Sequence, residues 1–316
     1  MQRSPKIHSA TPQTVDVLLF DQFSNHCLAN MVEPLRAANT LSQERLYDWR
    51  FCTLDGQAAV SSSGLRIAPD GPLRPGGGHM LVVMPSYGVR GHDTPKVAQA
   101  LRVAAAGYAV VAGLDTGPWL LARAGLLDGC RATLHRDVLD SFAEAFPAVD
   151  VVRERFVIDG ARITCSGAMA TFDLVSHLIA QTHGPLLAMD VAQLFMTEGA
   201  VPRTSLAPAG AGKLVARALS VMQAHLEAPL PIPALARQVG CTQKTLEARM
   251  QAALQATPQA VYQRLRLNHA HMLVCDTDHP ITEIAGRCGY ENASAMTRAF
   301  RAAFHATPTQ VRRQAG

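Results

Sequence analysis

Residues 113–119, Gly-Leu-Asp-Thr-Gly-Pro-Trp, have the composition of a catalytic turn. They follow the apolar run YAVVA at 108–112 and precede a helix-like segment. A strand, a glycine-flanked turn and a helix, in this order, form a nucleophile elbow that displays one side chain at its tip. The tip residue is Asp115, which is neither Ser nor Cys. The turn is therefore a catalytic site, a former catalytic site or a pocket with another use.

The residues alone leave three uses of the Asp115 carboxylate open. It could be a covalent nucleophile with His135 or His26 as its base, although a carboxylate is a poorer nucleophile than a thiolate and neither histidine lies in a specific motif. It could cap the helix that begins near Pro118, which is a common use of Asp. It could also supply negative charge to a ligand.

A second kind of chemistry is indicated by the distribution of charge. The net charge is +4, and residues 213–316 hold 12 Lys and Arg against 6 Asp and Glu, whereas residues 1–212 hold 17 against 19. A basic final third predicts contact with a polyanion such as nucleic acid. With 48% apolar and 17% charged residues, the chain can fill real cores and is not a disordered protein.

Cysteine usage and hydropathy exclude several other classes of protein. The 7 cysteines are irregularly spaced and contain no Cys-x-x-Cys pair, so we expect reduced thiols, a cytoplasmic protein and neither a metal site nor a disulfide framework. Cys165 is expected to be one of these buried thiols. No apolar run approaches the roughly 20 residues that span a bilayer, and the polar N-terminus lacks a signal core. We expect no membrane association and no cofactor.

The elements that must position the 113–119 turn alternate between strand and helix patterns. The patterns predict strands at 15–20, 49–54, 79–86 and 108–114, helices at 28–41, 95–107 and 168–184, and a hairpin at 155–165. This alternation predicts an α/β, flavodoxin-like fold with a mostly parallel sheet covered by helices. Ligands of such sheets bind beyond the carboxyl ends of the strands, where the turn is expected to lie.

The final hundred residues have helical patterns only, and they contain an internal repeat. LARQVG at 235–240 returns as IAGRCG at 284–289, and the segment from Leu246 returns from Met296. Each copy has a short helix, a glycine turn and a second helix, which predicts a helix-turn-helix. A purely structural helical bundle is the alternative, but two copies in the basic third favour DNA binding. The two units are expected at about residues 231–256 and 280–306.

These residues resemble the DNA-binding domain of AraC/XylS-type transcription regulators. The resemblance runs through LARQVGCTQKTLEARM, ATPQAVYQRLRLNHAHMLV and ITEIAGRCGYENASAMTRAFRAAFHATP. It implies a linking helix at about 258–275 that holds two recognition helices in successive major grooves of double-stranded DNA, roughly 34 Å apart. The first copy departs from the family, which usually has Arg at Ala248 and an aromatic residue at Met250. That departure puts the family's base contact from position 248 in doubt.

Helical periodicity separates the buried and exposed faces of the two recognition helices. Leu246 and Met250 are expected in one core, and Met296, Phe300 and Phe304 in the other. The expected DNA-contacting residues are then Gln243, Lys244, Thr245, Glu247, Arg249, Asn292, Ser294, Thr297, Arg298 and Arg301.

The expected roles of these residues differ. Arg298 sits where the family has its recognition arginine, and a forked Arg–guanine contact gives about 1–3 kcal/mol of discrimination. Lys244 and Arg301 could equally contact phosphates, which position the protein without specifying sequence. Glu247 would be repelled by DNA unless it accepts a hydrogen bond from cytosine. For each of these charged residues taken singly, the alternative to DNA contact is a position on a solvated helix face.

The first 180 residues or so resemble the PfpI-like, class I glutamine amidotransferase-like fold, which regulators of the GlxA type fuse to an AraC-type domain. The resemblance is carried by VDVLLF, EPLRAAN, SSSGLRIAPD, GLDTGPWLLARAGLLDGCRATLH and FPAVDVVRERFVIDGARITCSGAMATFDL. Enzymes of this fold have Cys at the elbow, whereas GLDTG, with Asp115 there, resembles the subgroup of regulators that sense betaine-, carnitine- or arginine-like compounds. Glu33 matches a glutamate that faces the elbow in the enzymes, and His135 falls near their catalytic histidine.

The ligand hypothesis follows from this pair of carboxylates. Asp115 and Glu33 cannot both be ionised cheaply in a dry pocket, and a cation would resolve the conflict. Aromatic rings attract quaternary ammonium groups, so Trp119, Tyr87 and Phe23 are expected to form the wall of the ligand site beside His135. The alternative for Trp119 is a core position.

The expected protein is a regulator of transcription and not an enzyme. It would be an activator and a homodimer that binds DNA, a small-molecule effector and RNA polymerase. The alternatives are a hydrolase that uses Asp115 as nucleophile and a constitutive architectural DNA binder. The expected domains are a flexible tail at 1–13, a sensor domain at 14–199, a linker at 200–212 and a DNA-binding domain at 213–316.

Overall fold

The structure, a computed structural model of the whole chain, describes residues 11–195 and 212–315. Residues 1–10 of the expected tail and 200–211 of the expected linker lie outside the described residues.

The chain divides into two compact units. The first unit extends to Val175 but leaves out Thr40–Gln43, and the second unit takes those residues together with the chain from Ser176 onward. Because the division falls within helix α6 (Ala168–His183), that helix begins in one unit and ends in the other. Among the described residues, no helix is long and apolar enough to cross a membrane.

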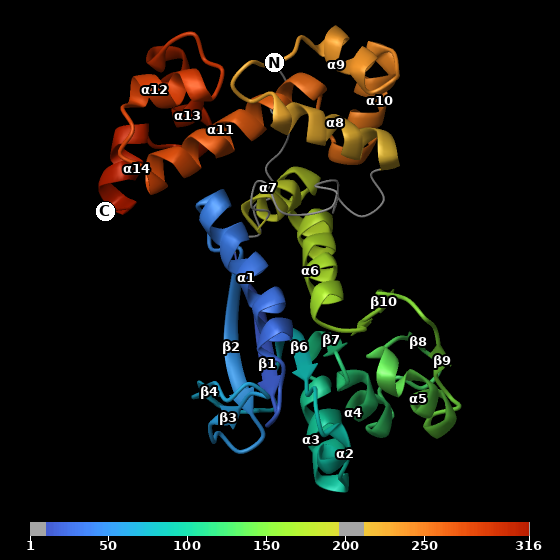
Figure 1. Cartoon of the computed structure of the whole chain (residues 1–316). Coiled ribbons are helices and arrows are strands. Elements are labelled where there is room, and N and C mark those ends of the chain that lie inside the picture. Colours follow the sequence, from blue (N-terminus) through green and yellow to red (C-terminus); the bar gives the residue numbers. More distant parts are fainter. Residues whose placement is uncertain (1–10, 196–211, 316) are drawn as a thin grey trace. The chain divides into compact units, whose positions relative to one another are not determined.

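A seven-stranded sheet is the centre of the first unit (Figure 1), in the order β10-β11-β7-β6-β1-β2-β5. Its strands are β1 (Gln13–Leu19), β2 (Tyr47–Thr53), β5 (Gly71–Pro72), β6 (Gly78–Met84), β7 (Tyr108–Leu114), β10 (Phe156–Asp159) and β11 (Arg162–Cys165). All neighbours pair in parallel except β10 and β11, which form the antiparallel hairpin. Without its two edge strands the sheet has the flavodoxin-like order, so the predicted fold class is confirmed.

Helices and two small sheets complete the first unit. The helices are α1 (Asn25–Ser42), α2 (Val89–His92), α3 (Pro95–Ala105), α4 (Gly117–Arg123), η1 (Arg136–Val138) and α5 (Leu139–Ala145), followed by α6. The small sheets pair β3 (Ala59–Val60) with β4 (Arg66–Ile67) and β8 (Arg131–Ala132) with β9 (Asp150–Val151). One core packs alternate strand residues such as Leu81 against α3, α4 and α5.

The second unit contains helices only in its described part. They are α7 (Pro185–Phe195), α8 (Gly212–Ala224), α9 (Ile232–Gln238), α10 (Gln243–Leu254), α11 (Pro258–Asp276), α12 (Ile281–Arg287), α13 (Ala293–Phe304) and α14 (Pro308–Ala315). Figure 1 shows α8 to α10 around one end of α11 and α12 to α14 around the other. Accordingly, α11 gives Val261 and Leu265 to one core and Ala270 and Val274 to the second.

The predicted repeat is visible in how the recognition helices begin and end. Thr242 caps α10 by accepting a hydrogen bond from the Thr245 amide, and Asn292 caps α13 by accepting one from the Ala295 amide. Both helices end at a left-handed residue, Gln255 or His305. The two copies of the sequence repeat therefore form two copies of one local structure.

Candidate functional site

Asp115 occupies the tip of a sharp turn between β7 and α4. Its φ is +59°, a left-handed value that Asp tolerates better than most residues. The flanking glycines are sterically required, since a Cβ at Gly113 would lie 2.8 Å from the Pro118 nitrogen and one at Gly117 would lie 2.1 Å from the Val83 carbonyl oxygen. The turn thus has the geometry of an elbow with a carboxylate at its tip.

The surroundings of Asp115 disfavour its charged form. The residue is 8% exposed. Burial raises the pKa of the Asp115 carboxyl, a hydrogen bond with the Ser86 side chain and the charge of His135 lower it, and Asp137 raises it. An ionised Asp115 therefore favours a nearby cation.

Helix capping does not account for Asp115. The cap position of α4 is Thr116, one residue further on. The Thr116 hydroxyl donates to the Ser86 carbonyl oxygen at 2.8 Å and makes no capping hydrogen bond.

His135 is the expected site residue that lies beside the elbow. Its backbone amide donates to the Asp115 carbonyl oxygen at 2.9 Å. Its Nδ1 accepts from the Asp137 amide at 3.4 Å and lies 3.7 Å from the Asp137 carboxylate. The 39% exposure of the His135 side chain leaves it accessible to a small molecule.

The expected pairing of Asp115 with Glu33 needs correction. Glu33 is on α1, its side chain is 45% exposed, and it forms an ion pair with Arg36 at 2.7 Å. The acidic side chain whose charge raises the pKa of Asp115 is Asp137. The resemblance implied that Glu33 faces the elbow, but the match of a short motif does not determine where the side chain points or which residue it pairs with.

Two of the three expected wall aromatics are core residues. Trp119 and Phe23 are 0% exposed, so the ring surface expected at the ligand site is not available on them. The Trp119 ring packs on Phe146, and its indole nitrogen donates to Asp93 at 2.8 Å. Tyr87 differs from both because it is 64% exposed.

The sequence did not predict that three residues near the elbow, Cys27, Cys165 and Thr171, lie in contact. The hydroxyl of Thr171 lies 3.4 Å from the Cys27 sulfur and 3.6 Å from the Cys165 sulfur. Burial raises the pKa of the Cys27 thiol, the Thr171 hydrogen bond lowers it, and the charge of Asp115 raises it. These residues come from α1, β11 and α6, so no local motif could have joined them. All 7 cysteines are free thiols, and Cys165 is buried as expected.

The first helix-turn-helix consists of α9 and α10. Gly240 forms its turn with a φ of +82°. Leu246 and Met250 are fully buried, as expected. The exposed residues of α10 include Gln243, Lys244, Thr245, Glu247 and Arg249. The Gln243 side chain donates a hydrogen bond to the Glu247 carboxylate at 2.7 Å, so these two polar side chains are linked on the exposed face of α10.

The second helix-turn-helix consists of α12 and α13. Met296, Phe300 and Phe304 form its buried stripe, as expected. The expected contact residues Asn292, Ser294, Arg298 and Arg301 are exposed, and Thr297 is half-buried. The carbonyl oxygen of the Asn292 side chain is already used by the helix cap.

The two helix-turn-helix copies are held together by more than α11. Arg266 on α11 donates to the carbonyl oxygens of Cys288 and Gly289 at 2.7 and 2.6 Å. A Cβ at Gly289 would lie 2.6 Å from the Pro229 side chain, so the second turn packs directly on the loop before α9. These contacts fix the second recognition helix relative to the first.

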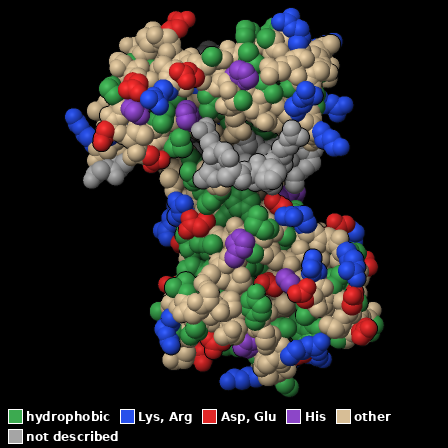
Figure 2. Space-filling view, in the orientation of Figure 1, with side chains coloured by type: hydrophobic (Ala, Val, Ile, Leu, Met, Phe, Trp, Pro, Cys, Tyr) green, Lys and Arg blue, Asp and Glu red, His purple; other side chains and the backbone are tan. Residues whose placement is uncertain are grey.

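On the face that Figure 2 shows, the basic side chains of the second unit stand at scattered positions. Within the described part of the chain, Lys244, Arg249, Arg298 and Arg301 form no ion pair with an acidic side chain. Their charges are available to phosphates or base edges.

Comparison with known proteins agrees with both units. A family model described as "DJ-1/PfpI family" matches residues 14–181, and one described as "Helix-turn-helix domain" matches residues 235–314. The HTH-type transcriptional regulator CdhR of Pseudomonas aeruginosa is 36% identical over 93% of this chain and 90% of its own length. The HTH-type transcriptional regulator GlxA of Rhizobium meliloti is 30% identical over 98% of each.

Solved structures give the same result for the fold. An AraC family transcriptional regulator from Pseudomonas putida matches with a TM-score of 0.50 and 26% identity, over 58% of this chain and 100% of that chain. A ThiJ/PfpI family protein from Pseudomonas syringae, at 15% identity and a TM-score of 0.53, covers 82% of this chain and 97% of its own. The chain belongs to the AraC-type helix-turn-helix transcriptional regulators that carry a DJ-1/PfpI domain.

Proposed function

We propose that this regulator reads two successive major grooves with α10 and α13. One observation supports this more than any other: both helices bury an apolar stripe and expose polar residues, and a single helix, α11, enters both of their cores. With 19 residues, α11 is about 28 Å long, which is comparable to one turn of DNA.

The proposed roles of the exposed residues follow from their local partners. Arg298 contacts a base, because it is exposed on α13 and carries the fork that matches guanine. Lys244 and Arg301 contact phosphates. Thr245 and Asn292 take part in helix caps, so they support the amino ends of the recognition helices and have less freedom to read bases.

The effector is proposed to be a small cationic amine bound at the elbow of the DJ-1/PfpI domain. The buried carboxylate of Asp115 supplies the negative charge, and a cation would offset the cost of its burial. Tyr87 and His135 supply accessible ring surface, whereas Trp119 and Phe23 support the turn from the core. Betaine-, carnitine- and arginine-like compounds have the required charge.

Isothermal titration calorimetry of the full chain with a panel of such amines tests this site. Asp115→Asn keeps the shape and the left-handed turn but removes the charge, so binding should weaken by at least tenfold. Glu33→Gln is the matched control, since Glu33 already pairs with Arg36. Equal affinity in the wild type and Asp115→Asn, or no binding of any amine, would refute the assignment.

We also propose that the elbow does not catalyse hydrolysis. A carboxylate is a poorer nucleophile than the thiolate that enzymes of this fold place at the elbow. When the wild-type protein is incubated with activated esters and amides, its burst of product should be no larger than the burst given by Asp115→Asn. A stoichiometric burst dependent on Asp115 would establish the hydrolase alternative.

The remaining parts of the proposal are activation of RNA polymerase and assembly as a homodimer. Transcription in vitro from a bound promoter should rise when the effector is added. Sedimentation of the full chain should give twice the mass of one chain. Effector-dependent loss of transcription would make the protein a repressor, and a monomer at micromolar concentration would exclude the dimer.

A further inference from the structure

A cavity of about 380 Å³ lies in the first unit, at the end of the sheet opposite the elbow. It is lined by Thr14 and Asp16 of β1, by residues 48–50 at the start of β2, by Tyr108 at the start of β7 and by residues 74–77 before β6. Asp115, in contrast, follows the last residue of β7. A seven-residue strand is roughly 23 Å long, so the cavity is separate from the proposed effector site.

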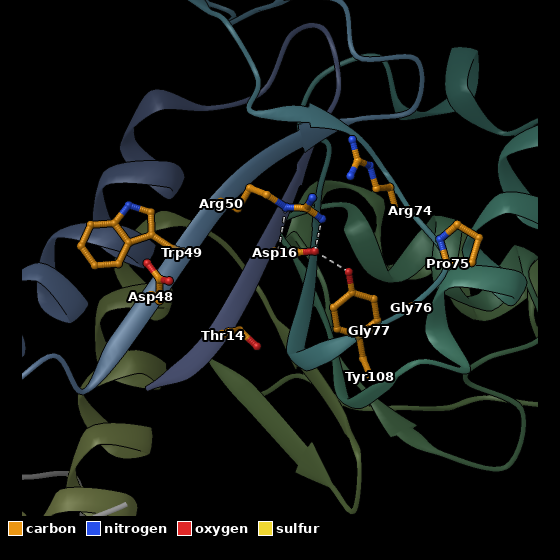
Figure 3. A pocket seen from close by; sticks show the side chains of 10 residues that line it. All are labelled: Thr14, Asp16, Asp48, Trp49, Arg50, Arg74, Pro75, Gly76, Gly77 and Tyr108. Atoms are coloured by element: carbon orange, nitrogen blue, oxygen red, sulfur yellow. Dashed lines mark hydrogen bonds and ion pairs between the residues drawn. The ribbon is translucent and has the colours of Figure 1, made fainter. Parts of the chain in front are cut away.

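Two side chains of the cavity lining donate hydrogen bonds to the Asp16 carboxylate (Figure 3). Arg50 donates to both carboxylate oxygens of Asp16, at 3.2 and 2.5 Å, and the Tyr108 hydroxyl donates to the same carboxylate at 2.5 Å. The Asp16 side chain is 13% exposed and that of Arg50 is 32% exposed. The network holds Arg50 in place, while its other N–H groups are not needed for the contact with Asp16.

The cavity lining contains two aspartates, Asp16 and Asp48, and two arginines, Arg50 and Arg74. Arg50 is paired with Asp16, and Asp48 is paired with Arg45 at 2.6 Å. Arg74 is exposed and has no acidic partner within the described residues. Figure 3 shows the guanidinium groups of Arg74 and Arg50 on the same side of the cavity, with the Asp16 carboxylate below Arg50. Among the charged lining residues, Arg74 is therefore the one without an ion-pair partner in the described part of the chain.

The loop that carries Arg74 packs closely on the backbone of Gly107 at one residue, Gly77. Gly77 has a φ of +83°, and a Cβ there would lie 1.5 Å from the Gly107 carbonyl oxygen. The loop at 74–77 is thereby held against the residue that precedes Tyr108. An unpaired guanidinium that lines the same cavity as a second, anchored one offers N–H donors suited to the planar oxygen pair of a carboxylate or the oxygens of a phosphate.

We propose that this cavity binds the oxyanion group of a small metabolite, with Arg74 as the main ligand-binding residue and Arg50 as the second. Its volume is at the small end of the range for ligand sites, which favours a compact anion. The anion site is independent of the cation site at the elbow, so the regulator would have two small-molecule inputs.

Calorimetric titration of the full chain with inorganic phosphate and, separately, with succinate tests this proposal. Saturable binding is expected for one of them, and the preferred anion identifies the source of the oxyanion. Arg74→Met should weaken binding by about tenfold or more, while Arg74→Lys should retain part of it because the charge remains. Since Arg74 is exposed, both variants should fold.

Two controls make the test decisive. Arg102→Met removes another exposed arginine of the first unit and should leave anion affinity unchanged. Asp115→Asn should also leave it unchanged, which separates failure of this proposal from failure of the elbow site. No saturable binding of either anion, or equal weakening by Arg74→Met and Arg102→Met, would overturn the proposal.

Discussion

At the residue scale, Asp115 shows how a turn that other proteins use for a nucleophile can hold a buried charge. The glycines at 113 and 117 permit the turn, and the left-handed φ suits Asp or Asn. Burial raises the pKa of the Asp115 carboxyl above the value in an unfolded chain. Folding therefore carries a cost when Asp115 must ionise, and this cost depends on pH.

Asp115→Asn should stabilise the protein at neutral pH. Below about pH 4, the ordinary Asp pKa, the carboxyl is protonated in both states and the variant should match the wild type. The variant's gain in free energy of unfolding should begin as pH rises through the pKa of Asp115 in the unfolded chain. It should be complete above the raised pKa of Asp115 in the folded protein. Each pH unit between these two pKa values corresponds to about 1.4 kcal/mol. Chemical denaturation at pH 4 and pH 7.5 measures it. A gain that is larger at pH 4 would contradict the buried-charge account.

Arg298 and Arg301 should differ when each is replaced by Ala. Loss of a base-reading Arg298 should cost about 1–3 kcal/mol on the operator and reduce discrimination against other sequences. Loss of a phosphate-contacting Arg301 should weaken binding to all DNA sequences alike. It should also reduce the slope of the logarithm of affinity against the logarithm of salt concentration by about 1. Fluorescence anisotropy at several salt concentrations separates the two. Identical behaviour of the two variants would remove the assigned roles.

The sequence predicts which face a residue occupies better than it predicts which residue it meets. Periodicity placed Leu246, Met250 and Phe300 in cores because burial repeats with the helix turn. It could not find Asp137 as the neighbour of Asp115, since Asp137 lies in the short helix η1, whose position depends on tertiary packing. For the same reason it could not distinguish a wall position from a core position for Trp119.

At the element scale, the repeat could be predicted from the sequence, but the core into which α7 packs could not. Two matching segments specify two matching helical hairpins whatever surrounds them. Helix α7 was expected within a sensor domain at 14–199, and that boundary stays a prediction. In the structure, Met189 of α7 joins the core of the first helix-turn-helix, although nothing in its own pattern identifies its packing partner.

The two turn glycines should tolerate Ala unequally. Gly240 and Gly289 both have positive φ, so either Ala variant should cost about 1–2 kcal/mol in strain. A Cβ at Gly240 meets open space, whereas one at Gly289 meets Pro229 at 2.6 Å and should cost about 1–3 kcal/mol more. Urea denaturation followed by circular dichroism compares them. Equal losses would show that the second turn does not pack as described.

A buried ion pair should hold α7 on the linking helix. Asp190 is 1% exposed and contacts Arg264 at 2.7 Å and the Asn268 amide at 2.6 Å. Asp190→Ala leaves Arg264 without its partner and should cost about 3 kcal/mol, the lower end of the range because the Arg264 side chain is 30% exposed.

The exposed pair Glu283–Arg287 is the matched control for this measurement. Glu283→Ala should cost no more than about 1 kcal/mol in the same denaturation experiment. If both variants lose the same stability, α7 is not anchored through Asp190.

At the scale of the whole molecule, the division of labour was visible in the bulk sequence. The charge difference between residues 1–212 and 213–316 and the change from alternating to purely helical patterns both indicated two kinds of domain. The anion cavity had no such signal, because Asp16, Arg50, Arg74 and Tyr108 come from four separate segments that only the sheet order brings together.

The central claim is that twin recognition helices on one linking helix read neighbouring major grooves. Methylation protection of guanines on a selected operator, bound by the full chain, tests it most directly because the modified nitrogen lies in the major groove. We expect two protected clusters for each protein chain, about 10 base pairs apart on one face of the duplex, with Arg298→Ala losing only one of them. A single cluster, or two clusters on opposite faces of the duplex, would contradict the account.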